Sequence, residues 1–194
     1  MEFVIATHNA HKVEEFNRIL KPLGITAVTA DLSEVDEAGT TFSQNAYLKA
    51  EAACRETGKP TIADDSGLSI YALGGEPGVY SARYAEPGHR REKVLNLLRD
   101  VPDEKRGAYF TSAICCVFPN GRILRAEGVC LGQIAYRNRG EGGFGYDPIF
   151  EVGGKTFAEM SGGEKDAVSH RGIALRAFAE QLEKWLQEGG YGTV

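Results

Sequence analysis

The chain has 194 residues, of which 42% are apolar, and a formal net charge of -5 at pH 7. This is enough apolar material for the core of one domain, or of two small lobes that share a core. Lysine and arginine are spread along the chain, so no basic stripe predicts a nucleic-acid partner. Polar residues begin at Thr7, too early for a signal peptide, and no apolar run is long enough to span a membrane, so we expect a cytoplasmic protein.

The first half of the chain alternates predicted strands with predicted helices. Apolar residues at helical spacing from Val13 to Leu23, followed by Gly24, predict the first helix, and Gly58 and Pro60 end the second. In chain order, we expect a strand at 2–6, a helix up to 23, a strand at 25–29, a helix from about 41 to 57 and a strand at 61–64.

The second half carries the clearest β signal. A short helix is expected at 91–99, and then two long strand-like runs, 107–118 and 122–136, flank a Pro-Asn-Gly turn, which predicts an antiparallel hairpin. A final helix should begin near His170. Its apolar stripe comprises Ile173, Leu175, Phe178, Leu182, Trp185 and Leu186.

Together these elements predict an α/β fold with a mixed sheet, in two lobes around a cleft, as a single domain over residues 1–194. The four cysteines contain no CxxC pair. Adjacent Cys115 and Cys116 should point to opposite faces of a strand. We therefore expect small buried side chains rather than disulfides or a zinc site.

The segment THNAHK, residues 7–12, lies where a phosphate-binding loop would lie, between a strand and a helix, but it contains no glycine. The free N–H groups of a helix N-terminus bind anions with or without glycine. Thr7 and Asn9 can cap the helix or contact phosphate oxygens, and Lys12 can supply a positive charge. The alternative is that Asn9 is only a helix cap and Lys12 only a solvated side chain.

Two adjacent carboxylates, Asp64 and Asp65, follow the third predicted strand in the segment ADDSG. At a strand end they can hold Mg²⁺ or activate water, or they can simply cap a turn with Ser66. Glu37, in the preceding acidic segment, favours the first interpretation. A magnesium ion bound to a phosphate substrate needs only one or two protein carboxylates.

Three further places are candidates for substrate binding. Lys49 lies on the second predicted helix, where its ammonium group can face the cleft, although a solvated helix lysine is commoner. The segment FGYDP, residues 144–148, suits base stacking, or is an ordinary loop with a buried phenylalanine. The segment EKDAVSHRG, residues 164–172, puts potential donors ahead of the last helix, for which Ser169 can be the N-cap.

These segments, taken in order, resemble the noncanonical purine nucleoside triphosphate pyrophosphatases, the inosine triphosphatase (RdgB-like) family. The matching stretches are THNAHK with the Glu15 that follows it, EAGTTFSQNAYLKA, ADDSGL, LGGEPGVYSARYA, GGFGYDPIF and EKDAVSHRG. The resemblance implies an elongated, two-lobed mixed α/β fold with a central substrate cleft. It also implies Mg²⁺-dependent hydrolysis of ITP, dITP and XTP to the monophosphate and pyrophosphate, usually by a homodimer that cleanses the nucleotide pool.

The resemblance further implies roles for individual residues. Asp65 and Glu37 bind the metal, Asp65 is the general base, Lys49 assists at the phosphates and Ser66 contacts the substrate. The phosphate-side loop consists of Thr7, His8, Asn9, Ala10, His11 and Lys12. The residues that enclose the base are Phe144, Gly145, Tyr146, Asp147, Lys165, His170 and Arg171.

Base selection would follow from hydrogen bonding. Donors on Lys165, His170 and Arg171 would meet the C6 oxygen of hypoxanthine or xanthine, whereas the C6 amino group of adenine would leave them unpaired. Each unpaired buried donor costs on the order of 1 to 3 kcal/mol.

Two positions depart from the family pattern: His8 stands where many relatives have glycine, and Ile173 stands where a basic or polar residue is frequent. Two alternative functions stay open at this point. One is a Maf-type pyrophosphatase acting on pyrimidine or modified nucleotides, against which the FGYD and SHR segments count. The other is a non-catalytic nucleotide sensor, against which Lys12, Glu37 and Asp65 count.

Overall fold

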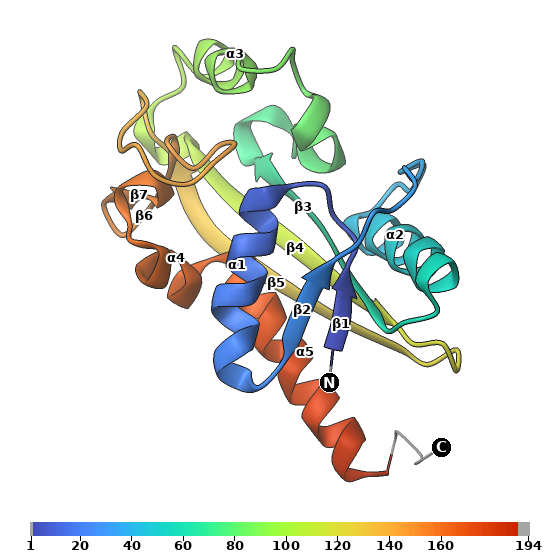
Figure 1. Ribbon diagram of the computed structural model, residues 1–194. Helices are drawn as coiled ribbons and strands as arrows, with labels where there is room; N and C mark the ends of the chain where they lie inside the picture. Colours follow the sequence, from blue (N-terminus) through green and yellow to red (C-terminus); the bar gives the residue numbers. More distant parts are fainter. Residues whose placement is uncertain (1, 190–194) are drawn as a thin grey trace.

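The protein is described by a computed structural model over residues 2–189, so the domain expected over 1–194 extends past the described residues at both ends (Figure 1). In this part of the chain the strands form one seven-stranded mixed sheet, in the order β2-β1-β3-β4-β5-β6-β7. Parallel pairing joins β1 to β2 and β3, and all other neighbours are antiparallel. The strands are β1 (Glu2–Ile5), β2 (Thr26–Thr29), β3 (Thr61–Ile70), β4 (Gly107–Val117), β5 (Ile123–Ile134), β6 (Phe150–Val152) and β7 (Lys155–Thr156). The predicted mixed α/β class is confirmed.

The long helices begin where side-chain caps predict. Asn9 caps α1 (Ala10–Leu20), Thr41 caps α2 (Phe42–Thr57) and Ser169 caps α5 (His170–Gln187), each by accepting backbone N–H groups of the first turn. Gly58, in the left-handed region at φ 65°, ends α2. The remaining helices are α3 (Arg90–Leu97), α4 (Gly162–Val168) and the 3₁₀ turns η1 (Lys21–Leu23), η2 (Tyr71–Leu73), η3 (Gly78–Arg83), η4 (Asp103–Lys105) and η5 (Phe157–Glu159).

Helices cover both faces of the sheet. Figure 1 shows α1 and α5 in front of the strands and α2 on the other side of β3 and β4. Cys116 belongs to the apolar cluster under α1 and α5, whereas its neighbour Cys115 belongs to the cluster under α2. A third cluster, around Phe110 and Phe150, fills the far end of the sheet. All four cysteines are buried and free, as predicted.

The third strand is longer than predicted, and this changes the placement of the acidic pair. β3 does not end near Asp64 but continues to Ile70, because β4 pairs with it residue by residue from Thr61 onward. Asp64 pairs with Ile114 of the cluster under α5, and Asp65 with Ala113 of the cluster under α2. The two carboxylates therefore lie within a strand and point to opposite faces of the sheet.

The other edge of β3 is largely free. β1 pairs with it only at Thr61 and Ile62, and an isolated bridge joins Ser69 to Pro77. Between Ala63 and Leu68 this edge has no neighbouring strand among the described residues. This open edge is where the β1–α1 turn passes, and it can be reached from both faces of the sheet.

Two smaller expectations are corrected. Ile173 and Leu186, placed on the apolar stripe of the last helix, are 36% and 38% exposed. The helix α4 was not predicted, because Gly162 and Gly163 at its start weaken its helical pattern.

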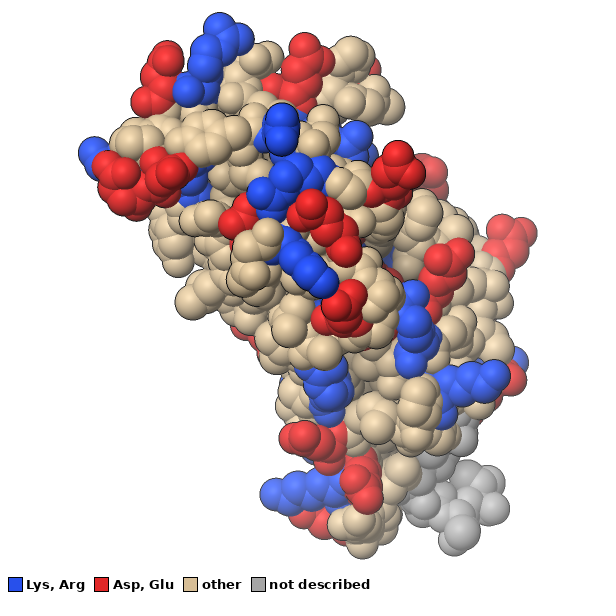
Figure 2. Space-filling view, turned by 90° about the vertical axis from the view of Figure 1, so that its left-hand side faces the viewer, with Lys and Arg blue, Asp and Glu red and all other residues tan. Residues whose placement is uncertain are grey.

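The surface agrees with the even distribution of charge in the sequence. On the face shown in Figure 2, basic and acidic side chains are interspersed rather than gathered by sign. Among the described helices, none is long and apolar enough to cross a membrane.

Candidate active site

Two adjoining cavities meet at the free edge of β3. The first, which we call the acidic cavity, has a volume of about 400 Å³ and is lined by Thr7, His8, Glu37, Lys49 and Asp65, among others. The second, the aromatic cavity, has a volume of about 380 Å³ and is lined by His11, Phe144, Tyr146, Asp147, Lys165, His170 and Arg171, among others. Both are bordered by Asn9, Lys12, Ser66 and Ala82. Nearly all the predicted site residues are therefore brought together.

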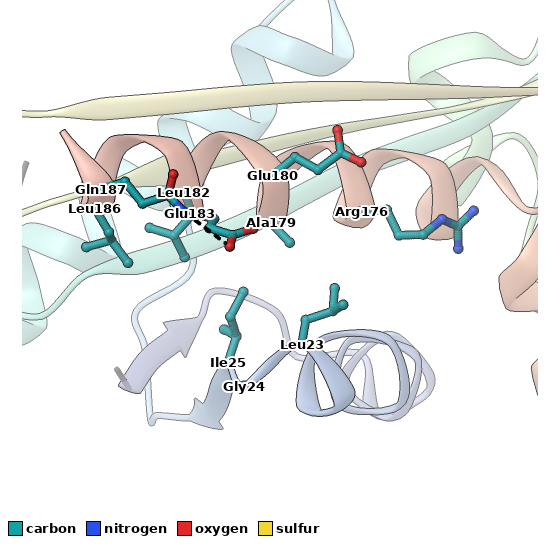
Figure 3. Close-up of a pocket in the computed structure, with 10 residues that line it drawn as sticks. All are labelled: Leu23, Gly24, Ile25, Arg176, Ala179, Glu180, Leu182, Glu183, Leu186 and Gln187. Atoms are coloured by element: carbon teal, nitrogen blue, oxygen red, sulfur yellow. Dashed lines mark hydrogen bonds between the residues drawn. The ribbon is translucent and has the colours of Figure 1, made fainter.

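A larger cavity lies elsewhere and lacks this chemistry. It measures about 620 Å³ and lies between α5 and the turn before β2 (Figure 3). Leu23, Ile25 and Leu182 point into it, and its charged residues, such as Glu180 and Glu183, come from the exposed side of α5. It contains none of the predicted site residues.

The β1–α1 turn is divided between the two cavities. Asn9 caps α1 by accepting the N–H of His11 at 3.0 Å and that of Lys12 at 3.4 Å, so the predicted helix cap is confirmed. Asn9 also borders both cavities. Thr7 and His8 face the acidic cavity, whereas His11 faces the aromatic one. Ala10 borders neither. The turn thus spans the site rather than serving the phosphate side alone.

Asp64 is the anion at the centre of the site. Its carboxylate accepts hydrogen bonds from Ser112 at 2.5 Å and Ser66 at 3.0 Å, and pairs with Lys12 at 2.7 Å and Arg171 at 3.0 Å. Burial alone would raise the pKa of Asp64, but Arg171 and Lys12 overcome this and hold the pKa well below its ordinary value. Asp64 is therefore a fixed negative charge that orients cations.

Asp65 has a different environment on the opposite face. Lys49 donates to its Oδ1 at 3.2 Å and Asn45 to its Oδ2 at 3.1 Å, and Lys49 also lies 3.4 Å from Glu37. Burial raises the pKa of Asp65, and nearby Glu37 and Asp64 raise it further against the opposing effect of Lys49. A carboxylate whose proton affinity is raised in this way is suited to act as a base.

The donor set of the acidic cavity fits a hard cation bound together with a phosphate. Glu37 and Asp65 both line it, and Lys49 pairs with both of them. Because this ammonium group carries one positive charge, it offsets only part of the negative charge of the two carboxylates. Within residues 2–189, no cluster of three or more His, Cys, Asp or Glu side chains could hold a metal by itself. The residues fit an ion that takes its remaining ligands from phosphate and water, as Mg²⁺ does.

A chain of alternating buried charges connects the two cavities. Lys165 contacts Glu15 and Asp147 at 2.6 Å each, and Glu15 also pairs with Arg171. The chain runs, in order, through Asp147, Lys165, Glu15, Arg171, Asp64 and Lys12. Although burial raises the pKa of Glu15, Arg171 and Lys165 lower it below its ordinary value. Because each buried charge has a partner of opposite sign, the chain fixes cations at both cavities.

These ion pairs change the expected recognition of the base. Glu15 and Asp147 accept two of the three N–H donors of Lys165, and Glu15, Asp64 and Ser66 occupy both terminal nitrogens of Arg171. The donors are therefore not all free to pair with a C6 oxygen. The donors that remain are a third N–H of Lys165, one N–H of Arg171 Nη1 and the buried Nε of Arg171, which has no hydrogen-bond partner among the described residues. The ring of His170 also remains, because its Nδ1 has no such partner either.

His170 is held as a neutral, buried ring. It stacks on Phe110 at 4.5 Å, and its Nδ1 has no hydrogen-bond partner in the described part of the chain. Burial, reinforced by Arg171, lowers the pKa of His170 well below 6.5. The close approach of α5 to β5 sets this position: at Gly128 a Cβ atom would collide with the carbonyl of His170.

The FGYD segment forms one wall of the aromatic cavity. Tyr146 donates through its hydroxyl to the carbonyl of Ser81 at 2.8 Å, and Asp147 accepts the N–H of Phe144 at 2.9 Å. Burial raises the pKa of Asp147 against the opposing effect of Lys165. A hydrogen bond thus connects this wall to η3. Residues of both η3 and α5 line the same cavity.

Sequence reasoning missed three residues of the site. Glu15 was noted only as part of a segment, and Asn45 and Ser112 were not singled out at all. Glu15 is three residues from Lys12 and so lies on the same side of α1, a signal that was available. Ser112 gave none, because its contact with Asp64 depends on the pairing of β3 with β4.

The chain is similar to known proteins over nearly its whole length. The sequence profile of the Ham1 family matches residues 3–181. A dITP/XTP pyrophosphatase of Thermus thermophilus is 50% identical over 93% of this chain and 91% of its own. One from Desulforamulus reducens is 47% identical over 95% and 96%. The solved structure of a HAM1 protein from Coxiella burnetii, 40% identical, superposes with a TM-score of 0.84 over 95% of this chain and 99% of that one.

Proposed function

The chain belongs to the Ham1 family, and we propose that it hydrolyses noncanonical purine nucleoside triphosphates, namely dITP, XTP and ITP, to the monophosphate and pyrophosphate. It is then a hydrolase acting on acid anhydrides, which removes deaminated purines from the nucleotide pool. One observation carries the proposal: a cavity with Lys12, Lys49 and Asp65 adjoins a cavity with aromatic walls and buried donors. A triphosphate and a purine need these two environments side by side.

The acidic cavity accounts for the phosphate chemistry. Water attacks the α-phosphorus, the bond to the bridging oxygen breaks, and pyrophosphate leaves with the electron pair. Asp65 accepts the proton of the attacking water, because its carboxylate borders the cavity. Lys12 and Lys49 offset the charge that moves onto the leaving pyrophosphate.

We infer that Glu37 and Asp65 hold Mg²⁺ in this cavity. When bound, the ion supplies positive charge to the phosphate oxygens in addition to that of the two lysines. Both carboxylates border the acidic cavity, and this supports the inference. Their number suits an ion that is bound together with the substrate.

The aromatic cavity accounts for base selection with fewer donors than first expected. Glu15 and Asp147 take two of the three N–H groups of Lys165, and the third is left to donate to a C6 oxygen. One unpaired donor costs on the order of 1 to 3 kcal/mol, which corresponds to roughly a 5- to 150-fold preference over ATP.

We also propose a homodimer located in the cytoplasm. The family resemblance suggests the dimer, and an exposed apolar face of the sheet supports it: Val129 and Leu131 of β5 are 46% and 67% exposed, and Tyr71 of η2 is 62% exposed. A patch of this kind is typical of an association surface. Light scattering on the purified protein tests the dimer, and Leu131→Lys should make it monomeric.

A substrate panel tests the proposed function. ITP, dITP, XTP, ATP, GTP, dTTP and UTP are compared with Mg²⁺, and pyrophosphate and orthophosphate are assayed separately. We expect monophosphate and pyrophosphate from the first three. Preferential cleavage of dTTP or UTP would instead indicate the Maf-type alternative, which the names of the relatives do not favour. Release of orthophosphate as the primary product would contradict the mechanism.

A further inference from the structure

Asn45 is a fully buried polar side chain that nothing in the mechanism yet uses. It lies in the first turn of α2 with 0% of its surface exposed. Its Nδ2 donates to Asp65 Oδ2 at 3.1 Å, and its Oδ1 accepts the backbone N–H of Gly39 at 2.8 Å. A single amide group therefore connects the general base on β3 with the acidic loop that carries Glu37.

The acidic loop, residues 30–41, has no helix or strand of its own. Within the loop, Glu37 pairs with Lys49 of α2 at 3.4 Å. Apart from the contact of Gly39, the hydrogen bonds that the loop makes to α2 ahead of its cap residue Thr41 lie at the surface: Ser33 donates to Glu56, and Thr40 donates to Gln44. Exposed contacts of this kind hold a loop weakly, because water competes for the same groups. Among the hydrogen bonds of residues 33–40, the contact of Gly39 with the buried Asn45 is therefore the one best shielded from water, and it lies two residues from Glu37.

The loop approaches Asn45 very closely. A Cβ atom at Gly39 would lie 2.5 Å from Asn45 Oδ1, so a larger residue could not take this position without a shift. The contact also fixes the orientation of the amide, because only the oxygen can accept the N–H of Gly39. The NH₂ group must then face Asp65.

The orientation of Asp65 follows from the same contact. Asn45 donates to one carboxylate oxygen and Lys49 to the other, so the carboxylate cannot rotate without losing a hydrogen bond. Each oxygen keeps a further lone pair for water or a cation. The carboxylate is held open toward the acidic cavity, on the side where Glu37 lies.

We propose that Asn45 is a positioning residue that sets the spacing between Glu37 and Asp65, and so prepares the two carboxylates to share one divalent cation. The role assigned to that cation rests on the proposed function, whereas the anchoring of the loop does not. Asn45 itself contacts neither the cation nor the substrate.

The test compares Asn45→Ala with Gln44→Ala, a neighbouring variant that removes an exposed contact of the same loop. The Gln44 side chain donates no hydrogen bond to Asp65, and the alanine keeps the Cβ atom that lies near Gly39. Hydrogen exchange of residues 33–40 is measured on the protein free of metal and nucleotide. The Mg²⁺ concentration for half-maximal ITP hydrolysis is measured separately. We expect Asn45→Ala to speed exchange and raise the half-maximal Mg²⁺ concentration roughly tenfold or more, with a much smaller change in the KM for ITP. Gln44→Ala should leave the Mg²⁺ dependence unchanged.

A double-mutant cycle with Glu37→Gln separates positioning from general stability. If Asn45 acts on the spacing of Glu37 and Asp65, the increase in Mg²⁺ requirement of the double variant is smaller than the sum of the two single effects, whereas fully additive effects would overturn the proposal. Unchanged exchange in Asn45→Ala would also overturn it, as would an equal shift in Gln44→Ala. Asn45→Ser, a milder truncation, provides both readouts if the alanine variant does not fold. If ITP is not hydrolysed at all, the proposed function fails, but the exchange result still decides the anchoring.

Discussion

The imidazole ring of His11 lies parallel to the ring of Phe144, with centroids 5.1 Å apart and 8° between the planes. His11 is exposed at the start of α1, and no hydrogen bond within residues 2–189 holds its ring. On the same aromatic residue, Lys165 lies 4.9 Å from the ring centroid. The free protein therefore stacks its own aromatic ring on the residue expected to stack the purine.

Replacement of His11 should consequently improve substrate binding. We expect His11→Ala to lower the KM for ITP by about 2- to 10-fold at an unchanged kcat, because the purine no longer displaces a stacked ring that contributes on the order of 0.5 to 1.5 kcal/mol. Steady-state kinetics measure this, with the exposed His89→Ala on α3 as the control. A raised KM would mean that His11 stays stacked and forms part of the bound state.

Asp65 should be required for turnover but not for binding. Asp65→Asn keeps the shape of the side chain but cannot accept a proton, so we expect kcat to fall by about 10²- to 10⁴-fold. Calorimetric titration with ITP should still detect binding. If the purified variant hydrolyses ITP at the wild-type rate, Asp65 is not the general base of this reaction.

The buried charge chain should make Lys165 important for stability. Lys165→Met leaves Asp147 without its cation, whereas Glu15 keeps its pair with Arg171, and a buried charge left without its partner costs about 3 to 5 kcal/mol in free energy of unfolding. Adding Asp147→Asn removes the stranded charge, so the double variant should recover part of this loss. Urea unfolding measures both variants. Losses that simply add would show that the two residues act independently.

His170 should make stability depend on pH in a defined window. Burial, reinforced by Arg171, places its folded-state pKa well below the ordinary value of 6.5, so below pH 6.5 the unfolded chain takes up a proton that the folded protein does not. The stabilising contribution is complete above that pH. It declines as pH falls, by about 1.4 kcal/mol per pH unit, until the folded pKa is reached.

The measurement compares the wild type with His170→Gln, which does not titrate. Free energies of unfolding in urea are determined from about pH 7.5 to about pH 5.5. Below pH 6.5 the free energy of unfolding of the wild type should fall more steeply than that of the variant, by about 1.4 kcal/mol per pH unit. Other titrating groups contribute to both proteins, so the difference isolates His170. Equal slopes would show that the folded protein protonates the ring.

Much of the fold follows from local signals in the sequence. Asn9, Thr41 and Ser169 each accept N–H groups within three residues, so the starts of the helices can be read without knowledge of the fold. The hairpin of β4 and β5 was equally legible, because its two strands are joined by a short turn. β3 was cut short in the prediction because Asp64, Asp65 and Ser66 look like a turn when their partner strand is unknown.

By itself, the sequence determined the family, the mixed α/β class and the set of residues that border the site, because segments from residue 7 to residue 172 carry a joint pattern. Only the tertiary structure decided how these residues are paired. Glu15 meets Lys165 and Arg171 across about 150 residues of chain, at separations of 150 and 156. Contacts at such separations depend on the docking of α1 against α5 and leave no periodic signal.

The acidic pair shows the same division most clearly. The residues themselves identified Asp64 and Asp65 only as neighbouring carboxylates at the end of a strand, and the family resemblance alone singled out Asp65 as the general base. The register of β3 against β4 places them on opposite faces, where Lys12 and Arg171 hold one as a fixed anion and burial near Glu37 raises the pKa of the other. Adjacent residues of a strand point in opposite directions, so the partners, and with them the chemistry, were decided by packing.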